Sequence, residues 1–256
     1  MFRYLVLCLL LVPISAHAYL VISDVDDTLK ITNSGDAREA AWNGFFKNDV
    51  FPGMPEIFRA WEADGAITYF VTASPKLIER KVRSLLGHHK IAYAGLTLRS
   101  NLLESKLRYK LRAIGRILDA NPHEDAVLIG DDVGDDPEVF AELKQRYGAR
   151  ILFAYVRPVQ RRELPEGIVP YVTAFDVAVA EQREGRLGLG TTLDAAKNVI
   201  AGNAEKLFPK FAWCPTEVRG SGLPTERAPY VTAVAVIRRI ESICRERLSA
   251  LESVSY

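Results

Sequence analysis

The sequence predicts an α/β protein built around a parallel β-sheet. Short β-branched and apolar runs alternate with helical patterns over residues 19–156, as in successive βαβ units. The 256 residues are 48% hydrophobic and 25% charged, which is ordinary globular composition and enough for one substantial core. With 33 basic and 32 acidic residues, the charge balance gives no indication of nucleic-acid binding.

The individual elements follow from this alternation and from its punctuation. Ser74-Pro75 and Asp136-Pro137 each place a capping side chain before a first-turn proline, and glycines follow several helical patterns. The predicted strands are Tyr19–Ser23, Ala66–Val71, Leu96–Leu98, Ala126–Ile129 and Ile151–Val156. The predicted helices between them are Pro55–Asp64, Pro75–Leu86, Ser105–Ala120 and Pro137–Tyr147.

Beyond about Pro170 the pattern becomes mainly helical. Helices are expected over Tyr171–Arg183, Leu193–Ala201 and Tyr230–Leu251, the last with one apolar face formed by Val234, Ile237, Ile240, Ile243 and Leu248. We therefore expect a core at 19–165 and a helical C-terminal extension at 166–256 that packs on it. Cys214 and Cys244 form either one disulfide or two buried thiols.

The first eighteen residues are typical of a signal peptide. Arg3 precedes the apolar run 5–14, and Ala16-His17-Ala18 then offers a small-x-small cleavage site. We expect an exported protein, periplasmic or secreted, whose mature part begins at Tyr19. Removing Arg3 leaves 32 basic and 32 acidic residues.

Acidic residues follow the first predicted strand directly. Asp24, Asp26 and Asp27 repel one another unless a cation or a special role compensates. Ligands of open α/β sheets bind at the carboxyl ends of the strands, where these residues fall. The alternative is a solvated acidic turn, and for Asp27 a solvated or turn-capping role is sufficient.

The segment Asp24-Val-Asp26-Asp-Thr28 resembles the first motif of the haloacid dehalogenase-like (HAD) superfamily. The resemblance implies a Rossmannoid three-layer fold, with Asp24 as nucleophile and Asp26 as general acid and base. The second aspartate favours phosphatase or phosphotransferase chemistry within the superfamily. Thr28 is expected to hydrogen-bond within the turn or contact substrate. The gap of residues 30–50 is too short for a full cap domain, so a minimal cap or none is expected.

Two further motifs of the superfamily supply a hydroxyl and a lysine. Thr72 and Ala73 follow the second strand and are expected to bind a phosphate oxygen, whereas Ser74 before Pro75 is most simply a helix N-cap. A lysine near the start of a later helix would pair with the nucleophile and the phosphoryl group. Lys110 matches this motif better than Lys106, although both remain candidates.

A second acidic cluster follows the fourth strand and predicts a magnesium site. Mg²⁺ prefers oxygen ligands and keeps several waters, so Asp24, the main-chain carbonyl of Asp26 and Asp131 suffice as protein ligands. Asp135 has the usual spacing from Asp131 for a further acid. The choice between Asp135 and Asp136 stays open, and Asp132 is a candidate for supporting the metal ligands.

Several segments resemble the catalytic domain of the actin-patch-associated phosphatidate phosphatases and their bacterial relatives. They are residues 22–32, 51–58, 70–75 and 129–140. The resemblance implies Mg²⁺-dependent hydrolysis of phosphatidate or a similar lipid phosphate. The alternatives are a small or protein-borne phosphomonoester, and a non-catalytic phosphate- or metal-binding domain. With a lipid substrate, an anionic head group or membrane surface would be contacted by Arg157, Arg161 and Arg162. The alternative is that these arginines form a solvated basic loop.

Overall fold

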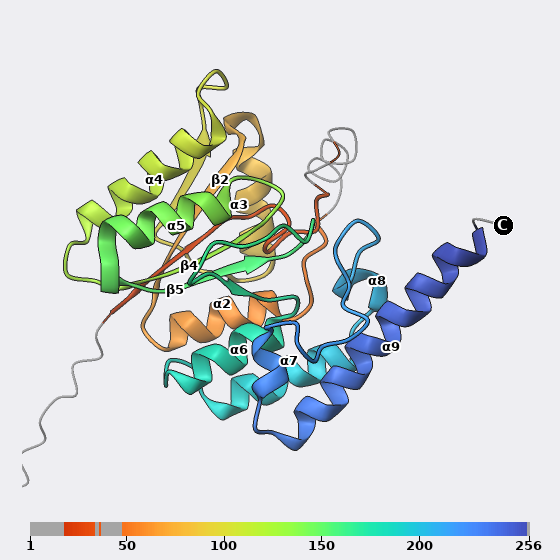
Figure 1. Cartoon of the computed structure of the whole chain (residues 1–256). Coiled ribbons are helices and arrows are strands. Elements are labelled where there is room, and N and C mark those ends of the chain that lie inside the picture. The colour runs from red at the N-terminus through yellow and green to blue at the C-terminus, as the bar shows by residue number, and fades with distance from the viewer. Residues whose placement is uncertain (1–17, 34–35, 37–47, 255–256) are drawn as a thin grey trace, which may run out of the picture.

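The computed structural model describes residues 18–33, 36 and 48–254, and it contains a three-layer α/β fold (Figure 1). Parallel strands form one sheet in the order β3-β2-β1-β4-β5-β6. Their bounds are β1 Leu20–Ser23, β2 Ile67–Pro75, β3 Gly95–Arg99, β4 Ala126–Asp131, β5 Ile151–Arg157 and β6 Val169–Pro170. The predicted α/β class and parallel sheet are confirmed.

Helices cover both faces of the sheet because alternate strand residues point to opposite sides. Leu20, Ile22 and Leu128 are buried under α4 and α5, whereas Val21 and Val127 belong to the core under α2 and α3. The helices are α2 Met54–Ala63, α3 Glu79–His88, α4 Lys106–Ala120, α5 Asp136–Tyr147, α6 Ala174–Arg183, α7 Leu189–Ala201, α8 Ala204–Leu207 and α9 Val231–Val254. The 3₁₀ turns are η1 Lys76–Ile78, η2 Gly148–Arg150 and η3 Pro224–Arg227.

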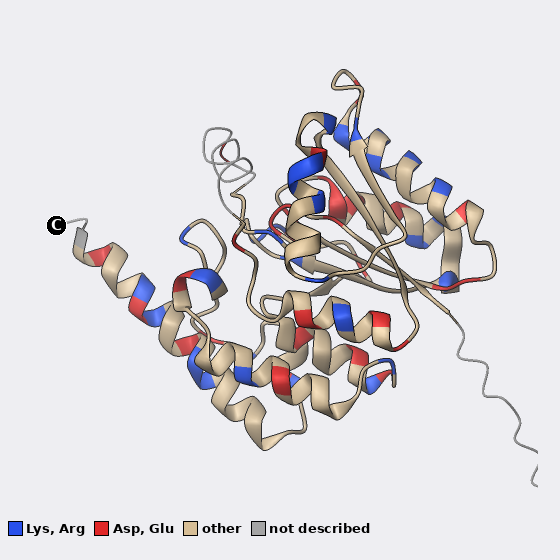
Figure 2. Cartoon of the chain, turned by 180° about the vertical axis from the view of Figure 1, so that it is seen from behind, with Lys and Arg blue, Asp and Glu red and all other residues tan. Residues whose placement is uncertain are grey.

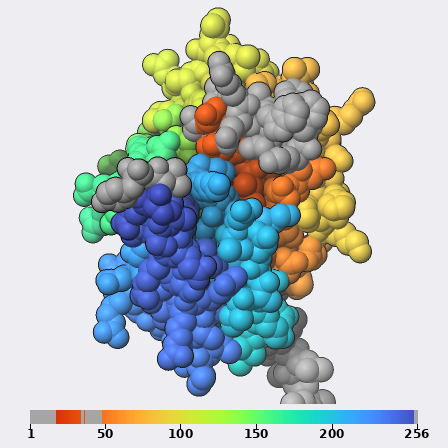
Figure 3. Space-filling model, turned by 90° about the vertical axis from the view of Figure 1, so that its right-hand side faces the viewer, coloured from red at the N-terminus to blue at the C-terminus, as the bar shows by residue number. Residues whose placement is uncertain are grey.

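The mainly helical C-terminal region packs against α2 through α6 and α7, and α9 packs on α7 (Figures 1 and 3). The same apolar core contains Trp61 of α2, Phe175 of α6 and Ile240 of α9, so this region is continuous with the α/β part. A disulfide joins Cys214 to Cys244. The division at residue 165 stays a prediction. No helix in the described part of the chain has the length and apolar character needed to cross a membrane.

Three local predictions are wrong. Asp136 does not cap α5, because it is the first residue of that helix and Asp135 occupies the N-cap position. Ser74 is not a helix N-cap, because β2 continues to Pro75 and α3 begins only at Glu79, after η1. On α9, Val234 is 51% exposed and Leu248 47% exposed, whereas Ala233, Val236 and Cys244 join Ile240 and Ile243 in the buried stripe. A helix turns 100° per residue, so the buried stripe is displaced from the predicted one.

Two predictions fall mainly on residues that are not described. The signal peptide at 1–18 lies outside the described residues except for its last position. The span 30–50, expected to be too short for a cap domain, is described only at 30–33, 36 and 48–50.

Candidate active site

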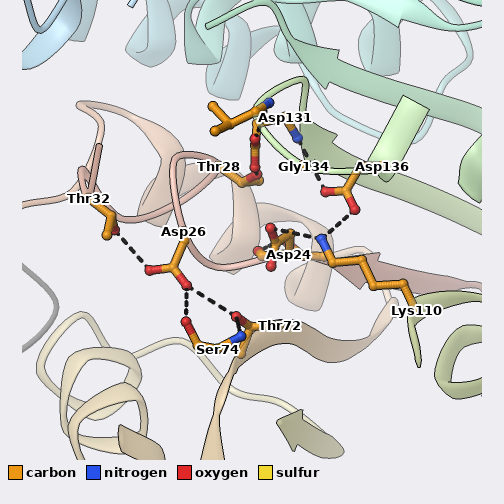
Figure 4. A network of polar contacts seen from close by, with 12 residues as sticks. Asp24, Asp26, Thr28, Thr32, Thr72, Ser74, Lys110, Asp131, Gly134 and Asp136 are labelled. Atoms are coloured by element: carbon orange, nitrogen blue, oxygen red, sulfur yellow. Dashed lines mark hydrogen bonds and ion pairs between the residues drawn. The ribbon is translucent and has the colours of Figure 1, made fainter. Parts of the chain in front are cut away.

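The two acidic clusters meet because their strands are neighbours in the sheet. β1 pairs with β4, and the amide of Asp24 donates to the carbonyl of Ile129 at 2.9 Å. This pairing places Asp24, just past β1, beside Asp131 at the end of β4 (Figure 4). Carboxylate oxygens of Asp24, Asp131 and Asp136 all lie within 4.8 Å of one another.

Asp136 joins this group from the first turn of α5, and a glycine makes room for it. Its carboxylate folds back over Gly130, where a Cβ atom would lie 2.3 Å from Asp136 Oδ2. The amide of Asp131 donates weakly to the same oxygen at 3.4 Å. A glycine at position 130, near the end of β4, is therefore needed for the Asp136 carboxylate to approach the strand.

Lys110 supplies positive charge to the three carboxylates. Its ammonium, carried by α4, lies 3.0 Å from Asp24 Oδ2 and also donates to Asp136 Oδ1. Burial alone lowers the pKa of Lys110, but Asp136, Asp24 and Asp131 outweigh it and raise that pKa above 10.5. With three acids and one base fully ionised, the cluster carries a formal charge of −2.

The carboxylates are destabilised as anions. Burial raises the pKa of Asp24 from 3.8 to about 7; Lys110 opposes this rise, and Asp136 and Asp26 add to it. Burial, followed by Asp136 and Asp24, raises the pKa of Asp131 well above 3.8. A cation bound among these oxygens would relieve the repulsion.

The donor set fits a hard divalent cation. Oδ1 of Asp24 is buried without a hydrogen-bond partner among the described residues, which leaves a carboxylate oxygen available as a ligand. Carboxylate oxygens are the ligands that such ions prefer. The three carboxylates of Asp24, Asp131 and Asp136, called the Asp triad below, are therefore suited to hold a metal ion.

Asp26 lies on the other side of Asp24 and accepts hydrogen bonds from three hydroxyls (Figure 4). Thr32 Oγ1 donates to its Oδ1 at 2.9 Å, while Thr72 Oγ1 and Ser74 Oγ donate to its Oδ2 at 3.1 and 2.7 Å. The amide of Ser74 in turn donates to Thr72 Oγ1 at 3.1 Å. Three donors hold this carboxylate in one orientation.

Ser74 is a partner of Asp26 that the motifs of the sequence do not identify. Residues two apart on a strand point to the same face, so a strand continued past Thr72 brings Ser74 to the same side. The available signal was the pair of hydroxyls at positions 72 and 74.

The rest of the first motif builds the turn that carries Asp26. Asp27 is fully buried rather than solvated; its φ is 55°, and its Oδ1 accepts the amides of Thr32 and Asn33 at 2.9 and 2.8 Å. Thr28 donates to Asp131 Oδ2 at 3.4 Å, across to the next strand. The turn is thereby tied to both acidic clusters.

The remaining acids after β4 have different positions. Asp135 precedes α5 and lines the cleft, but it does not belong to the Asp triad. Asp132 is buried and accepts the amides of Gln160 and Arg162 at 2.7 and 2.9 Å, so it fixes the loop after β5. Of the alternatives left open by spacing, Asp136 is the one that contacts Lys110.

An open cleft of about 470 Å³ unites the candidate residues. Asp24, Asp26, Thr72 and Lys110, the predicted catalytic set, all line it, as do Ala73, Asp131 and Asp135. Lys106 also lines the cleft, but the ion pairs with Asp24 and Asp136 are made by Lys110, one turn further along α4.

The expectation that Arg157 contacts a head group is wrong. β5 continues through this residue, and its guanidinium is buried between the rings of Phe51 and Tyr171, at 3.7 and 4.8 Å from their centroids. It also donates to the carbonyl of Val172. Arg161 and Arg162 are exposed, and Arg162 pairs with Glu138.

One family model and two solved chains are similar to this chain. The family model described as "Phosphatidate phosphatase APP1, catalytic domain" matches residues 19–158. No curated protein matches the chain. Two solved chains are similar at 16% identity, from "Structure of Pnkp1/Rnl/Hen1 complex" (TM-score 0.37) and "Structure of the Pnkp1/Rnl/Hen1 RNA repair complex" (TM-score 0.39). The matches cover 54% and 60% of this chain but only 45% and 43% of those chains, less than half of their length.

Proposed function

The chain belongs to the family of the phosphatidate phosphatase APP1 catalytic domain and is a phosphatase, and on that premise we propose that it hydrolyses phosphatidate, or a closely similar lipid phosphate, with Mg²⁺. The products are diacylglycerol and inorganic phosphate. The observation that carries the proposal is the environment of the Asp24 carboxylate, which lines an open cleft. Its Oδ1 has no hydrogen-bond partner among the described residues, and the Lys110 ammonium lies 3.0 Å from its Oδ2.

In the proposed first step, Asp24 attacks phosphorus and forms an aspartyl-phosphate. The bond between phosphorus and the lipid oxygen breaks, and Asp26 gives its proton to the departing alkoxide. In the second step Asp26 takes a proton from water, whose oxygen attacks phosphorus and releases phosphate and Asp24. The hydroxyls of Thr32, Thr72 and Ser74 orient Asp26 for both transfers.

Electrostatics decide whether the nucleophile can approach an anionic substrate. Lys110 offsets the repulsion between the Asp24 carboxylate and the phosphoryl oxygens. A Mg²⁺ ion held by Asp24, Asp131 and Asp136, with the Asp26 carbonyl as a further ligand, would supply the positive charge that keeps these carboxylates ionised. Thr72 and Ala73 line the place where a phosphate oxygen would lie.

The proposed substrate class follows from the family and is compatible with the cleft, because an opening to solvent leaves room for a large group attached to the phosphate. The main alternative is a small-molecule or protein-borne phosphomonoester. A panel of phosphatidate, lysophosphatidate, sugar phosphates and phosphopeptides separates these classes, because the enzyme should prefer phosphatidate by kcat/KM.

The nucleophile is tested with Asp24→Asn in the purified mature protein. Phosphate release with Mg²⁺ should fall by at least about 10³-fold. Asp194→Asn, an exposed change on α7, serves as the matched control and should retain full activity. Full activity of Asp24→Asn would overturn the mechanism, while a preference for another phosphomonoester would overturn only the substrate.

We also propose export through removal of residues 1–18. A disulfide such as Cys214–Cys244 persists in oxidising compartments, and Tyr19 is buried at the start of the fold, so a mature chain that begins there keeps its core. N-terminal sequencing of the extracytoplasmic protein tests this, and recovery of an uncleaved cytoplasmic chain would overturn it.

A further inference from the structure

Three large apolar side chains are exposed on segments that border the cleft. Leu77 is 83% exposed in the turn after β2, and Leu102 and Leu103 are 58% and 97% exposed in the loop after β3. Single exposed leucines are common on protein surfaces, but a group of them beside a site marks an interaction surface. We call these three residues the leucine rim.

The segments that carry the leucine rim begin at the edge of the cleft. Pro75 and Arg99 pair across β2 and β3 and both line the cleft, so the segments that carry the leucines leave the sheet side by side. The loop after β3 protrudes beyond α3 and α4 (Figure 1).

The protruding loop is held by its own contacts. Arg99 donates to the carbonyl of Glu104 at 3.2 Å, and the amide of Leu103 donates to Asn101 Oδ1 at 3.0 Å. Glu104 also pairs with Arg112 of α4 at 2.6 Å. The leucines are thus presented by a built turn.

The surroundings of the leucine rim are positively charged. Lys76, Lys106 and Arg108 are exposed and have no ion-pair partner within the described part of the chain. The neighbouring acids Glu79 and Glu104 are neutralised by Arg83 and Arg112. Figure 2 shows further basic residues on α3 and along α4 below the loop. Exposed leucines beside unpaired basic side chains are complementary to an anionic lipid bilayer, in which acyl chains lie beneath negatively charged head groups.

The cleft itself explains why such a surface is needed. Acids, hydroxyls and lysines dominate its lining, and the described residues that line it form no apolar channel for two acyl chains. A diacyl phosphate must keep its chains in the bilayer while its head group reaches Asp24. The enzyme must therefore come to the membrane.

We propose that the leucine rim inserts into an anionic lipid bilayer and sets the cleft at the level of the head groups. Leu77, Leu102 and Leu103 enter the acyl boundary, while Lys76, Lys106 and Arg108 contact phosphates. This inference rests on the proposed function for its substrate, but the binding itself is measured without catalysis.

Flotation with phosphatidylcholine vesicles, with and without phosphatidate, tests the proposal. The protein carries Asp24→Asn so that the lipid is not consumed. Binding should require phosphatidate and should weaken with added salt. Adding Leu102→Ser and Leu103→Ser should weaken it by roughly 30-fold or more, from the lost burial of two leucines. The matched control is Val231→Ser, 91% exposed on α9 and away from the loop, which should bind like the parent.

Activity on a short-chain, monomeric phosphatidate separates docking from chemistry. In the active protein, the two serine substitutions should change kcat/KM on this substrate by less than about twofold and lower the rate on vesicles in parallel with binding. Equal vesicle binding by the variant overturns the proposal. So does a change from dimer to monomer in analytical ultracentrifugation, which would assign the leucines to a self-interface. Leucine-dependent binding without hydrolysis of any phosphatidate would instead refute the proposed function alone.

Discussion

Replacing Lys110 by methionine removes one buried positive charge and keeps most of the apolar stem. At 3.0 Å from Asp24, the ammonium contributes about 5 kcal/mol of attraction at an effective dielectric constant of about 20. A second contact of the same kind, to Asp136, is lost as well. The acids respond by taking up a proton, which removes part of the repulsion between them. We therefore expect a net loss of about 3–5 kcal/mol in the free energy of unfolding, less than the sum of the two lost attractions.

The loss should depend on pH with a definite sign. Asp24 has a folded-state pKa of about 7 against 3.8 for the ordinary group, so the folded protein holds a proton that the unfolded chain releases. Stability therefore falls as pH rises through this window. Without Lys110 the folded pKa rises further, and the fall continues to higher pH. The deficit of the variant should be larger at pH 8 than at pH 5.

Urea unfolding of the metal-free proteins at pH 5 and pH 8 measures this effect. Lys106→Met is the matched control, one turn earlier on α4 and exposed, and should cost less than about 0.5 kcal/mol. Added Mg²⁺ should restore more stability to Lys110→Met than to the parent, while phosphatase activity falls by about 10²–10³-fold. A deficit below about 1 kcal/mol at pH 8, or one independent of pH, would refute the assignment of Lys110 as the compensating charge.

Three further predictions concern the metal, the close approach at β4 and the disulfide. Without metal, the free energy of unfolding of the parent should fall by up to roughly 4 kcal/mol between about pH 4 and pH 7, because Asp24 ionises in the unfolded chain but keeps its proton in the folded protein. Mg²⁺ should raise the Tm of the parent most above pH 7, and a Tm shift that does not depend on pH contradicts this. Gly130→Ala puts a Cβ 2.3 Å from Asp136 Oδ2 and should weaken Mg²⁺ binding at least about tenfold by calorimetry, whereas unchanged affinity would exclude Asp136 as a ligand. Replacing Cys214 and Cys244 by serine opens a loop of 30 residues and should cost about 3–4 kcal/mol in urea unfolding, and an unchanged midpoint would show that the bond does not stabilise the fold.

Most of the fold could be predicted because its signals are local. Short apolar runs such as Leu20–Ser23, and helices that begin at proline or end at glycine, depend on residues close in sequence. A parallel sheet then requires that acids after two of its strands lie at one edge. For this reason Asp24 and Asp131 could be assigned to one site although 107 positions separate them.

The choice between neighbouring side chains depended on the tertiary structure. Asp135 and Asp136 differ by one position, and only the path of the chain over Gly130 decides that Asp136 reaches Lys110. Ser74 could be an N-cap or a partner of Asp26, and pairing of β2 with β3 through Pro75 decides for the latter. The sequence by itself determined the fold class, the strand ends that carry the acids and the kind of chemistry. The tertiary structure decided the contacts, the burial of Arg157 and the disulfide, because these depend on how distant segments approach one another in space.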